Sequence, residues 1–131
     1  MVKRRDGVKT VLVVEDSPTQ SIHMQTLMES AGLRCVLASN GQTGLYLAQS
    51  ILPDVMILDL EMPHMNGFQV CQELKSDPDT AKIPIILMTR HDESESVAQG
   101  LELGAIEFIP KDTFADVVLL ETLKQMNVIP S

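Results

Sequence analysis

The sequence predicts an α/β fold of five strand–helix units, (βα)5, in which five parallel strands form one doubly wound sheet. Short apolar runs alternate with amphipathic segments along the 131 residues, which is typical of βαβ units joined by right-handed crossovers. The runs at 11–14, 55–58 and 83–88 are almost continuously apolar, as expected for strands that helices cover on both faces. The length and the 44% hydrophobic content suit one domain with its own core.

The strands are expected, in chain order, at 11–14, 35–38, 55–58, 83–88 and 106–109. The second and fifth runs are less strongly apolar than the other three. A strand at the edge of a sheet is less completely covered than a central one, so we expect these two nearer the edges.

The first two helices carry clear start signals. Ser17 is a capping residue, and Pro18 stands at the first helical position, where its missing N–H costs nothing. Gly32 is expected to end this helix. Asn40-Gly41 turns the chain into the second helix. The apolar stripe of the first helix is Met24, Leu27, Met28 and Ala31.

The third and fourth helices have thinner apolar stripes. The third carries Phe68, Cys71 and Leu74, and it is expected to stop before the Asp77-Pro78 pair. The fourth is expected from about 94 to 103, with Gly104 after it.

The fifth helix is expected from 112 or 113 to about 126. Its predicted core stripe is Val117, Leu120 and Leu123. Val118 and Leu119 then lie beside the stripe as apolar surface that packing on the sheet does not need. This surface predicts a homodimer or partner face.

Composition excludes several classes of protein. The formal net charge of −8 and the 3% aromatic content argue against direct nucleic-acid binding, which needs a basic face. No apolar stretch is long enough to span a membrane, and the two cysteines are expected to be reduced and mostly buried. We therefore predict a cytoplasmic protein with a flexible basic leader (1–9), one domain (10–127) and a C-terminal tail (128–131).

Chemistry-bearing residues follow four of the five predicted strands. Glu15-Asp16 follow the first, Asp59 the third and Thr89 the fourth, and the fifth leads into Lys111. Because parallel strands end at one edge of the sheet, where ligands bind, these side chains should converge. Crowded carboxylates favour a hard divalent cation with oxygen ligands, and we expect Mg²⁺. Lys111 can pair with a carboxylate or with a phosphoryl oxygen.

Four motifs in this order resemble the receiver domains of bacterial two-component response regulators. The run 59–67 (DLEMPHMNG) resembles their phosphoacceptor strand and loop, and 13–17 (VVEDS) their acidic pair. Met88-Thr89 resembles the switch hydroxyl, and 108–111 (FIPK) the switch aromatic and lysine. The resemblance covers about 10–126 and implies a flavodoxin-like sheet with strand order 2-1-3-4-5.

The resemblance implies roles for the site. Asp59 accepts a phosphoryl group from a sensor histidine kinase or a histidine phosphotransfer protein, assisted by Lys111. Asp16 and Asp59 ligate Mg²⁺ directly, Glu15 does so through water, and the backbone carbonyl of Glu61 completes the set. The chain is then a regulatory phosphoacceptor rather than an enzyme.

The family also implies a switch. Thr89 moves toward the phosphoryl oxygen and Phe108 follows inward, which changes the surface of the fourth helix, fifth strand and fifth helix. This surface is where a downstream protein or a second copy would bind. Only five residues follow Met126, which suggests a stand-alone receiver, although a receiver excised from a longer regulator is an alternative.

The sequence departs from the family pattern at two places. Asp112 follows Lys111 where the family usually has proline after a cis bond; a cis bond without proline costs about 2.5–4 kcal/mol, and the sequence leaves cis and trans both open here. Glu61 and His91 occupy positions two after Asp59 and Thr89. We expect their side chains to meet across the mouth of the site and to tune dephosphorylation.

A different class of protein could use the same acids. A Mg²⁺-dependent phosphoryl-transfer or strand-cleaving enzyme with a topoisomerase-primase-like sheet would employ Glu15 and the Asp59-x-Glu61 pair. That alternative leaves Thr89, Lys111 and the loop after Asp59 without a role.

Overall fold

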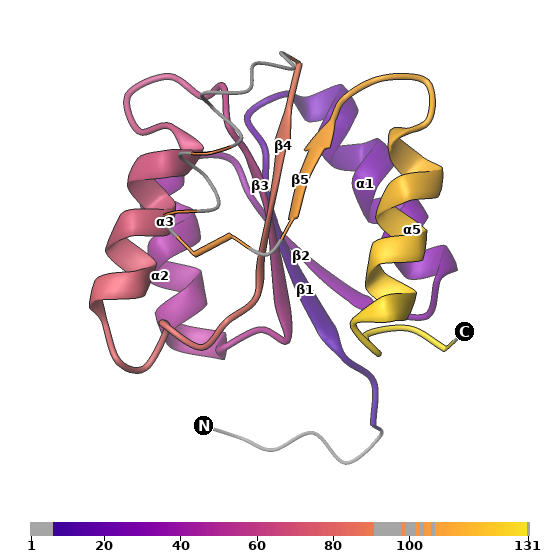
Figure 1. Cartoon of the computed structure of the whole chain (residues 1–131), viewed down its shortest axis with the longest axis horizontal. Coiled ribbons are helices and arrows are strands. Elements are labelled where there is room, and N and C mark those ends of the chain that lie inside the picture. Colours follow the sequence, from indigo (N-terminus) through magenta and orange to yellow (C-terminus); the bar gives the residue numbers. More distant parts are fainter. Residues whose placement is uncertain (1–6, 91–97, 99–101, 103, 106, 131) are drawn as a thin grey trace.

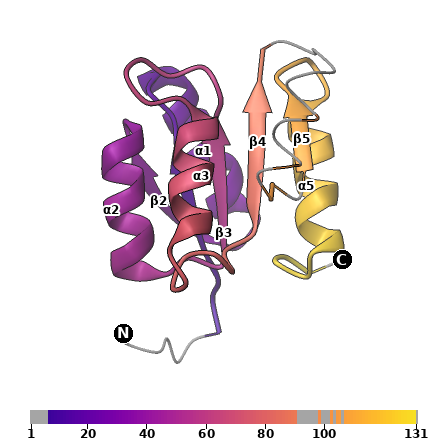
Figure 2. The same cartoon turned by 60° about the vertical axis from the view of Figure 1, so that its left-hand side comes forward.

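The sheet has the predicted strands and the predicted order. The computed structural model describes residues 7–90, 98, 102, 104, 105 and 107–130. Its five parallel strands run in the order β2-β1-β3-β4-β5, so the two more polar strands are the edges (Figure 2). The strands are β1 (Thr10–Val14), β2 (Arg34–Ala38), β3 (Val55–Asp59), β4 (Ile85–Thr89) and β5 (Glu107–Pro110).

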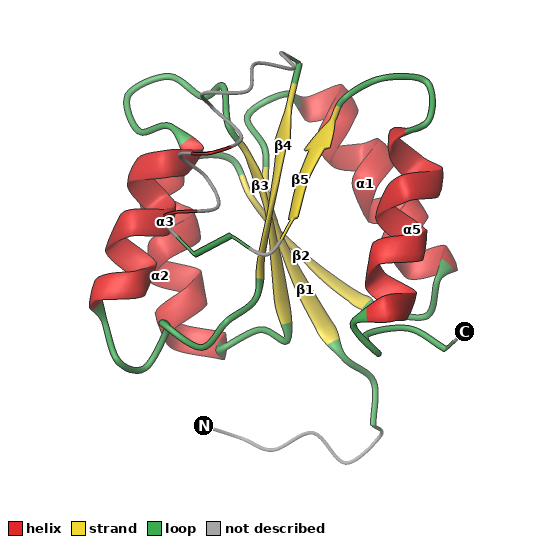
Figure 3. Ribbon diagram, in the orientation of Figure 1, coloured by secondary structure: helices red, strands yellow, loops and turns green. Residues whose placement is uncertain are grey.

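Helices cover both faces of the sheet. The helices are α1 (Pro18–Ser30), α2 (Gly41–Ile51), α3 (Gly67–Ser76) and α5 (Ala115–Gln125). Figure 1 shows α2 and α3 on one face and α1 and α5 on the other. Figure 3 shows loops at the end of the sheet where the strands finish. The helix predicted at 94–103 falls largely outside the described residues.

The sheet separates two hydrophobic clusters, and alternate residues of each strand serve one or the other. On β1, Leu12 and Val14 pack in the cluster under α2 and α3, whereas Val11 and Val13 pack under α1 and α5. All five residues of β1, β3 and β4 are buried. Burial on both faces is the physical reason why these strands are continuously apolar rather than alternating.

Side-chain caps fix where three helices begin, at the end of the sheet where the strands finish. Ser17 accepts a backbone N–H from the first turn of α1, and Asn40 accepts the N–H of Thr43 at 2.8 Å. Asn66 and Gln69 form a reciprocal capping box at α3. The predicted starts of the first two helices are confirmed.

The predicted face of α5 is right for Leu123 and Val118 but wrong for Val117 and Leu119. Leu119 and Leu123 are both 0% exposed, whereas Val117 is 62% exposed and Val118 is 42% exposed. Leu119 therefore belongs to the core and cannot contribute to a partner surface. Val117, which was expected in the core, is exposed instead. Leu120 is only partly buried.

The C-terminal end of the domain differs from the expected tail. Val128 and Ile129, placed in a C-terminal tail by sequence, are buried against α1 and α5, and the N–H of Val128 donates to the carbonyl of Leu123 at 2.9 Å. Residues 1–6 of the predicted leader lie outside the described part. Cys35 and Cys71 are free thiols, half-buried and buried. None of the described helices is long and apolar enough to cross a membrane.

Gly67, the first residue of α3, lets this helix approach the end of β3 closely. A Cβ atom here would lie 3.0 Å from both the carbonyl oxygen of Asp59 and the Cα of Leu60. We expect Gly67→Ala to lower the free energy of unfolding by about 1–2 kcal/mol, because backbone must shift to admit the methyl group. Urea unfolding measures this, with exposed Gln72→Ala on the same helix as control. Equal stability of both variants would contradict the prediction.

Candidate functional site

The strand register brings the predicted site residues to one edge of the sheet. Val14 pairs with Leu58, so Glu15 and Asp59 are level at the ends of neighbouring strands. Thr89 pairs with Pro110, which places Lys111 directly beyond. The convergence expected from the strand ends is confirmed.

One ammonium bridges two buried carboxylates. Lys111 Nζ lies 2.9 Å from Glu15 Oε1 and 3.0 Å from Asp59 Oδ1. The side chains of Glu15 and Asp59 are 5% and 4% exposed, and that of Lys111 is 12% exposed. The other oxygen of Glu15 accepts the N–H of Ser17 at 3.1 Å, and Asp59 Oδ1 accepts the N–H of Glu61 at 3.2 Å.

The pKa values of the two carboxyl groups are shifted in opposite directions. Burial raises the pKa of Asp59 to about 7; Lys111 opposes this rise, and the neighbouring Glu15 adds to it. Burial also acts to raise the pKa of Glu15, but the hydrogen bonds from Lys111 and Ser17 outweigh it, so that this pKa is lowered. Without a cation, Glu15 is therefore the member that keeps its charge, and Asp59 is the one that can hold a proton.

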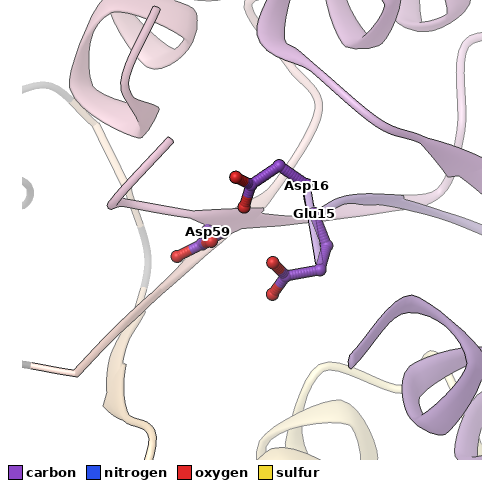
Figure 4. A group of neighbouring side chains, drawn as sticks. All are labelled: Glu15, Asp16 and Asp59. Carbon is purple, nitrogen blue, oxygen red and sulfur yellow. The ribbon is translucent and has the colours of Figure 1, made fainter. Parts of the chain in front are cut away.

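A third carboxylate, which is exposed to solvent, lies beside this pair. Figure 4 shows Asp16 and Glu15, at the end of β1, beside Asp59. One carboxylate oxygen from each lies within 4.8 Å of the others, and Asp16 is exposed. Three carboxylates and one ammonium leave a net charge of about two minus when all are ionised. A hard divalent cation matches both this charge and the all-oxygen donor set.

Glu61 lies at the same edge, but its side chain has other partners. Its Oε2 accepts the hydroxyl of Thr89 at 2.5 Å, and its Oε1 accepts the N–H of Arg90 at 2.9 Å. Among the described residues the grouped carboxylates are Glu15, Asp16 and Asp59, without Glu61. The Asp59-x-Glu61 ligand pair of the alternative enzyme is therefore not formed. Sequence reasoning missed the contact with Thr89.

Of the remaining predicted residues, the structure describes Phe108 and Asp112 but not His91. Phe108 is 9% exposed and already packs in the core under α3. No cis peptide bond occurs in the described chain, so Lys111-Asp112 is trans. His91 lies outside the described residues, and its contact with Glu61 stays a prediction.

A cavity of about 350 Å³ opens beside Lys111, lined by residues of α1 and α5. Lys111, Glu15 and Asp59 line it together with His23 and Asp116, whose Nε2 and Oδ2 atoms are 2.8 Å apart. His23 is exposed on α1, and because its partner lies 93 residues away the sequence carries no local signal of the contact. The cavity belongs to the same site as the carboxylates.

Comparison with known proteins agrees with this geometry. Residues 11–124 match the family model described as the response regulator receiver domain. Protein PilH of Pseudomonas aeruginosa is 34% identical over 109 residues, which are 83% of this chain and 90% of that protein. The response regulator PleD of Caulobacter vibrioides is 36% identical over 89% of this chain, but the match spans only 26% of PleD.

A solved structure shows the same fold. The chemotaxis protein CheY4 of Vibrio cholerae superposes with a TM-score of 0.84 at 28% identity, over 91% of this chain and 98% of that one. The family match spans every described strand except the first residue of β1, and the site lies within it. This chain belongs to the family of response regulator receiver domains of two-component systems.

Proposed function

We propose that this chain accepts a phosphoryl group on Asp59 and thereby switches a protein-binding surface. The observation that carries the proposal is the buried Asp59 carboxylate, held 3.0 Å from Lys111 Nζ and grouped with Glu15 and Asp16. Receiver domains are regulatory phosphoacceptors rather than classical enzymes, and family membership supports the same role here.

The chemistry asks the site for positioning and for charge compensation. In transfer from a phosphohistidine, the phosphorus–nitrogen bond breaks and a bond forms between phosphorus and an Asp59 oxygen. The electron pair stays on the imidazole nitrogen, which takes a proton from water. Lys111 is close enough to Asp59 to offset charge on the phosphoryl oxygens, and this is the main way in which proteins lower the barrier to phosphoryl transfer.

The donor set fits Mg²⁺, which receiver domains bind in their acidic pocket. Asp16, Asp59, the backbone carbonyl of Glu61 and, through water, Glu15 would hold it. All four offer the hard oxygen ligands that this ion prefers. When bound, it would neutralise the charge of the carboxylates and of the incoming phosphoryl group.

The proposal includes partners and a switch. A histidine kinase or histidine phosphotransfer protein would supply the phosphoryl group, and a downstream protein would read the response through Thr89 and Phe108. Phe114, Val117 and Val118 give the α5 side exposed apolar surface for such contact. A homodimer through this surface and the cytoplasmic location both stay predictions.

Incubation with acetyl phosphate tests the phosphoacceptor. We expect intact mass to show one phosphoryl adduct that forms in Mg²⁺ and does not form when EDTA is present from the start. Asp59→Asn should abolish the adduct, whereas Asp79→Asn, an exposed carboxylate of the α3–β4 connection, should retain it. An adduct that survives Asp59→Asn, or no adduct at any donor concentration, would contradict the proposal.

A further inference from the structure

The Glu61 carboxylate, in the loop after β3, accepts hydrogen bonds from residues at the end of the neighbouring strand β4. Each of its oxygens accepts one hydrogen bond, Oε2 from the Thr89 hydroxyl at 2.5 Å and Oε1 from the Arg90 N–H at 2.9 Å. Hydrogen bonds to an ionised acceptor are shorter and stronger than neutral ones. Both donors belong to the end of β4, so Glu61 holds this end through two consecutive residues.

The same hydroxyl is the one that the proposed switch requires. Thr89 is 0% exposed, and Asp59 pairs in register with the preceding residue, Met88. The Leu60 N–H donates to the Met88 carbonyl at 2.8 Å, which keeps the two strand ends together. A phosphoryl group on Asp59 would therefore be formed beside a hydroxyl that already donates to Glu61.

A threonine hydroxyl has one proton and can donate it to one acceptor at a time. We propose that Glu61 is a positioning residue that holds the Thr89 hydroxyl in the unphosphorylated protein and competes for it with the phosphoryl group on Asp59. Phosphorylation then switches the β4 end only to the extent that the phosphoryl oxygen displaces the Glu61 carboxylate. This inference rests on the proposed function.

Simple charge repulsion is the rival explanation, because a carboxylate near a phosphoryl group would weaken its binding even without Thr89. The two explanations differ in their dependence on the hydroxyl. Competition requires Thr89, whereas repulsion between Glu61 and the phosphoryl group does not. A double-mutant cycle over Glu61→Ala and Thr89→Val separates them.

The cycle can be measured with beryllofluoride and Mg²⁺, a phosphoryl mimic that binds a carboxylate. We expect Glu61→Ala to tighten beryllofluoride binding by about fivefold or more, since a charge-assisted hydrogen bond no longer has to be broken. In the Thr89→Val background the tightening should be at least about threefold smaller. Glu61→Gln, which keeps an uncharged acceptor oxygen, should fall between, and exposed Glu73→Ala on α3 should have no effect. Equal tightening in both backgrounds, or none with Thr89 present, would overturn the proposal.

The hydrogen bond from the Arg90 N–H to Glu61 can be followed by NMR in the unphosphorylated protein. We expect Glu61→Ala to move the Arg90 amide proton resonance upfield, as a lost hydrogen bond requires, and Glu73→Ala to leave it in place. An unmoved Arg90 resonance would overturn the proposal. If the wild-type protein bound no beryllofluoride, or bound it equally after Asp59→Asn, the proposed function would fail instead, and the Arg90 resonance would still report the Glu61 contact.

Discussion

Asparagine in place of Asp59 is expected to make the protein more stable in magnesium-free buffer at neutral pH. The wild-type site buries two carboxylates against one ammonium, and an excess buried charge costs several kcal/mol. The amide removes the excess, because Lys111 keeps Glu15 as its partner at 2.9 Å. The substitution that abolishes the proposed function should therefore raise the free energy of unfolding.

The effect should depend on pH in a defined direction. The pKa of Asp59 rises from its ordinary value of 3.8 to about 7 on folding. Between these values the folded protein holds a proton that the unfolded chain has released, so wild-type stability falls as pH rises. The shift corresponds to at most about 4 kcal/mol. We expect the advantage of Asp59→Asn to be small near pH 4, to grow through pH 7 and then to level off.

Urea unfolding in EDTA at several pH values measures this difference, with Asp79→Asn as a control that changes the net charge equally. Added Mg²⁺ should stabilise the wild-type protein more than Asp59→Asn and so narrow the gap, because a ligand stabilises the state that binds it. An Asp59→Asn protein that is no more stable than Asp79→Asn at pH 8 would contradict the burial cost assigned to Asp59.

The sequence predicts the location of the site well because two simple constraints determine it. Strands buried on both faces must be continuously apolar, which makes β1, β3 and β4 easy to recognise. Parallel strands all end at one edge, so the residues that follow them converge whatever the details of packing. The positions of Glu15 and Asp59, at the ends of β1 and β3, follow from these constraints.

The face of α5 could not be predicted because its apolar residues occupy four consecutive positions, 117–120, which gives no helical phase. The structure buries Ala115 and Thr122 with Leu119 and Leu123. The Thr122 hydroxyl donates to the Val118 carbonyl at 2.8 Å, which satisfies it within the helix. Hydrophobicity alone would bury Val118 and expose Thr122, but the structure does the opposite.

The contact between Glu61 and Thr89 was missed for a different reason. Both residues were placed at the site, but their pairing depends on the path of the loop after β3. The Gly67 N–H donates to the Leu60 carbonyl at 3.2 Å, and α3 then begins directly against the strand end. Sequence spacing carries no information on a side-chain contact across 28 residues.

Replacing Lys111 by methionine is expected to have the opposite effect on stability from Asp59→Asn. Methionine keeps an apolar side chain of similar length but leaves Glu15 and Asp59 facing each other without the ammonium. Removing one partner of a buried ion pair costs about 3–5 kcal/mol. In magnesium-free buffer at pH 8 we expect a loss in this range, and a smaller loss at pH 5, where Asp59 is protonated in the folded protein.

If Mg²⁺ binds at these carboxylates as proposed, the same substitution should strengthen its binding, because the Lys111 ammonium beside Glu15 and Asp59 would no longer repel the cation. We expect roughly tenfold tighter binding by titration calorimetry, which corresponds to about 1.4 kcal/mol, and recovery of most of the lost stability once Mg²⁺ is bound. Lys82→Met, which removes an exposed lysine and changes the net charge equally, is the matched control. If Lys111→Met bound Mg²⁺ no more tightly than Lys82→Met, the metal would not bind beside Lys111, and the three carboxylates would not form one metal site. Opposite changes in stability from Asp59→Asn and Lys111→Met would locate the excess negative charge of the apo protein at this cluster rather than over its acidic surface.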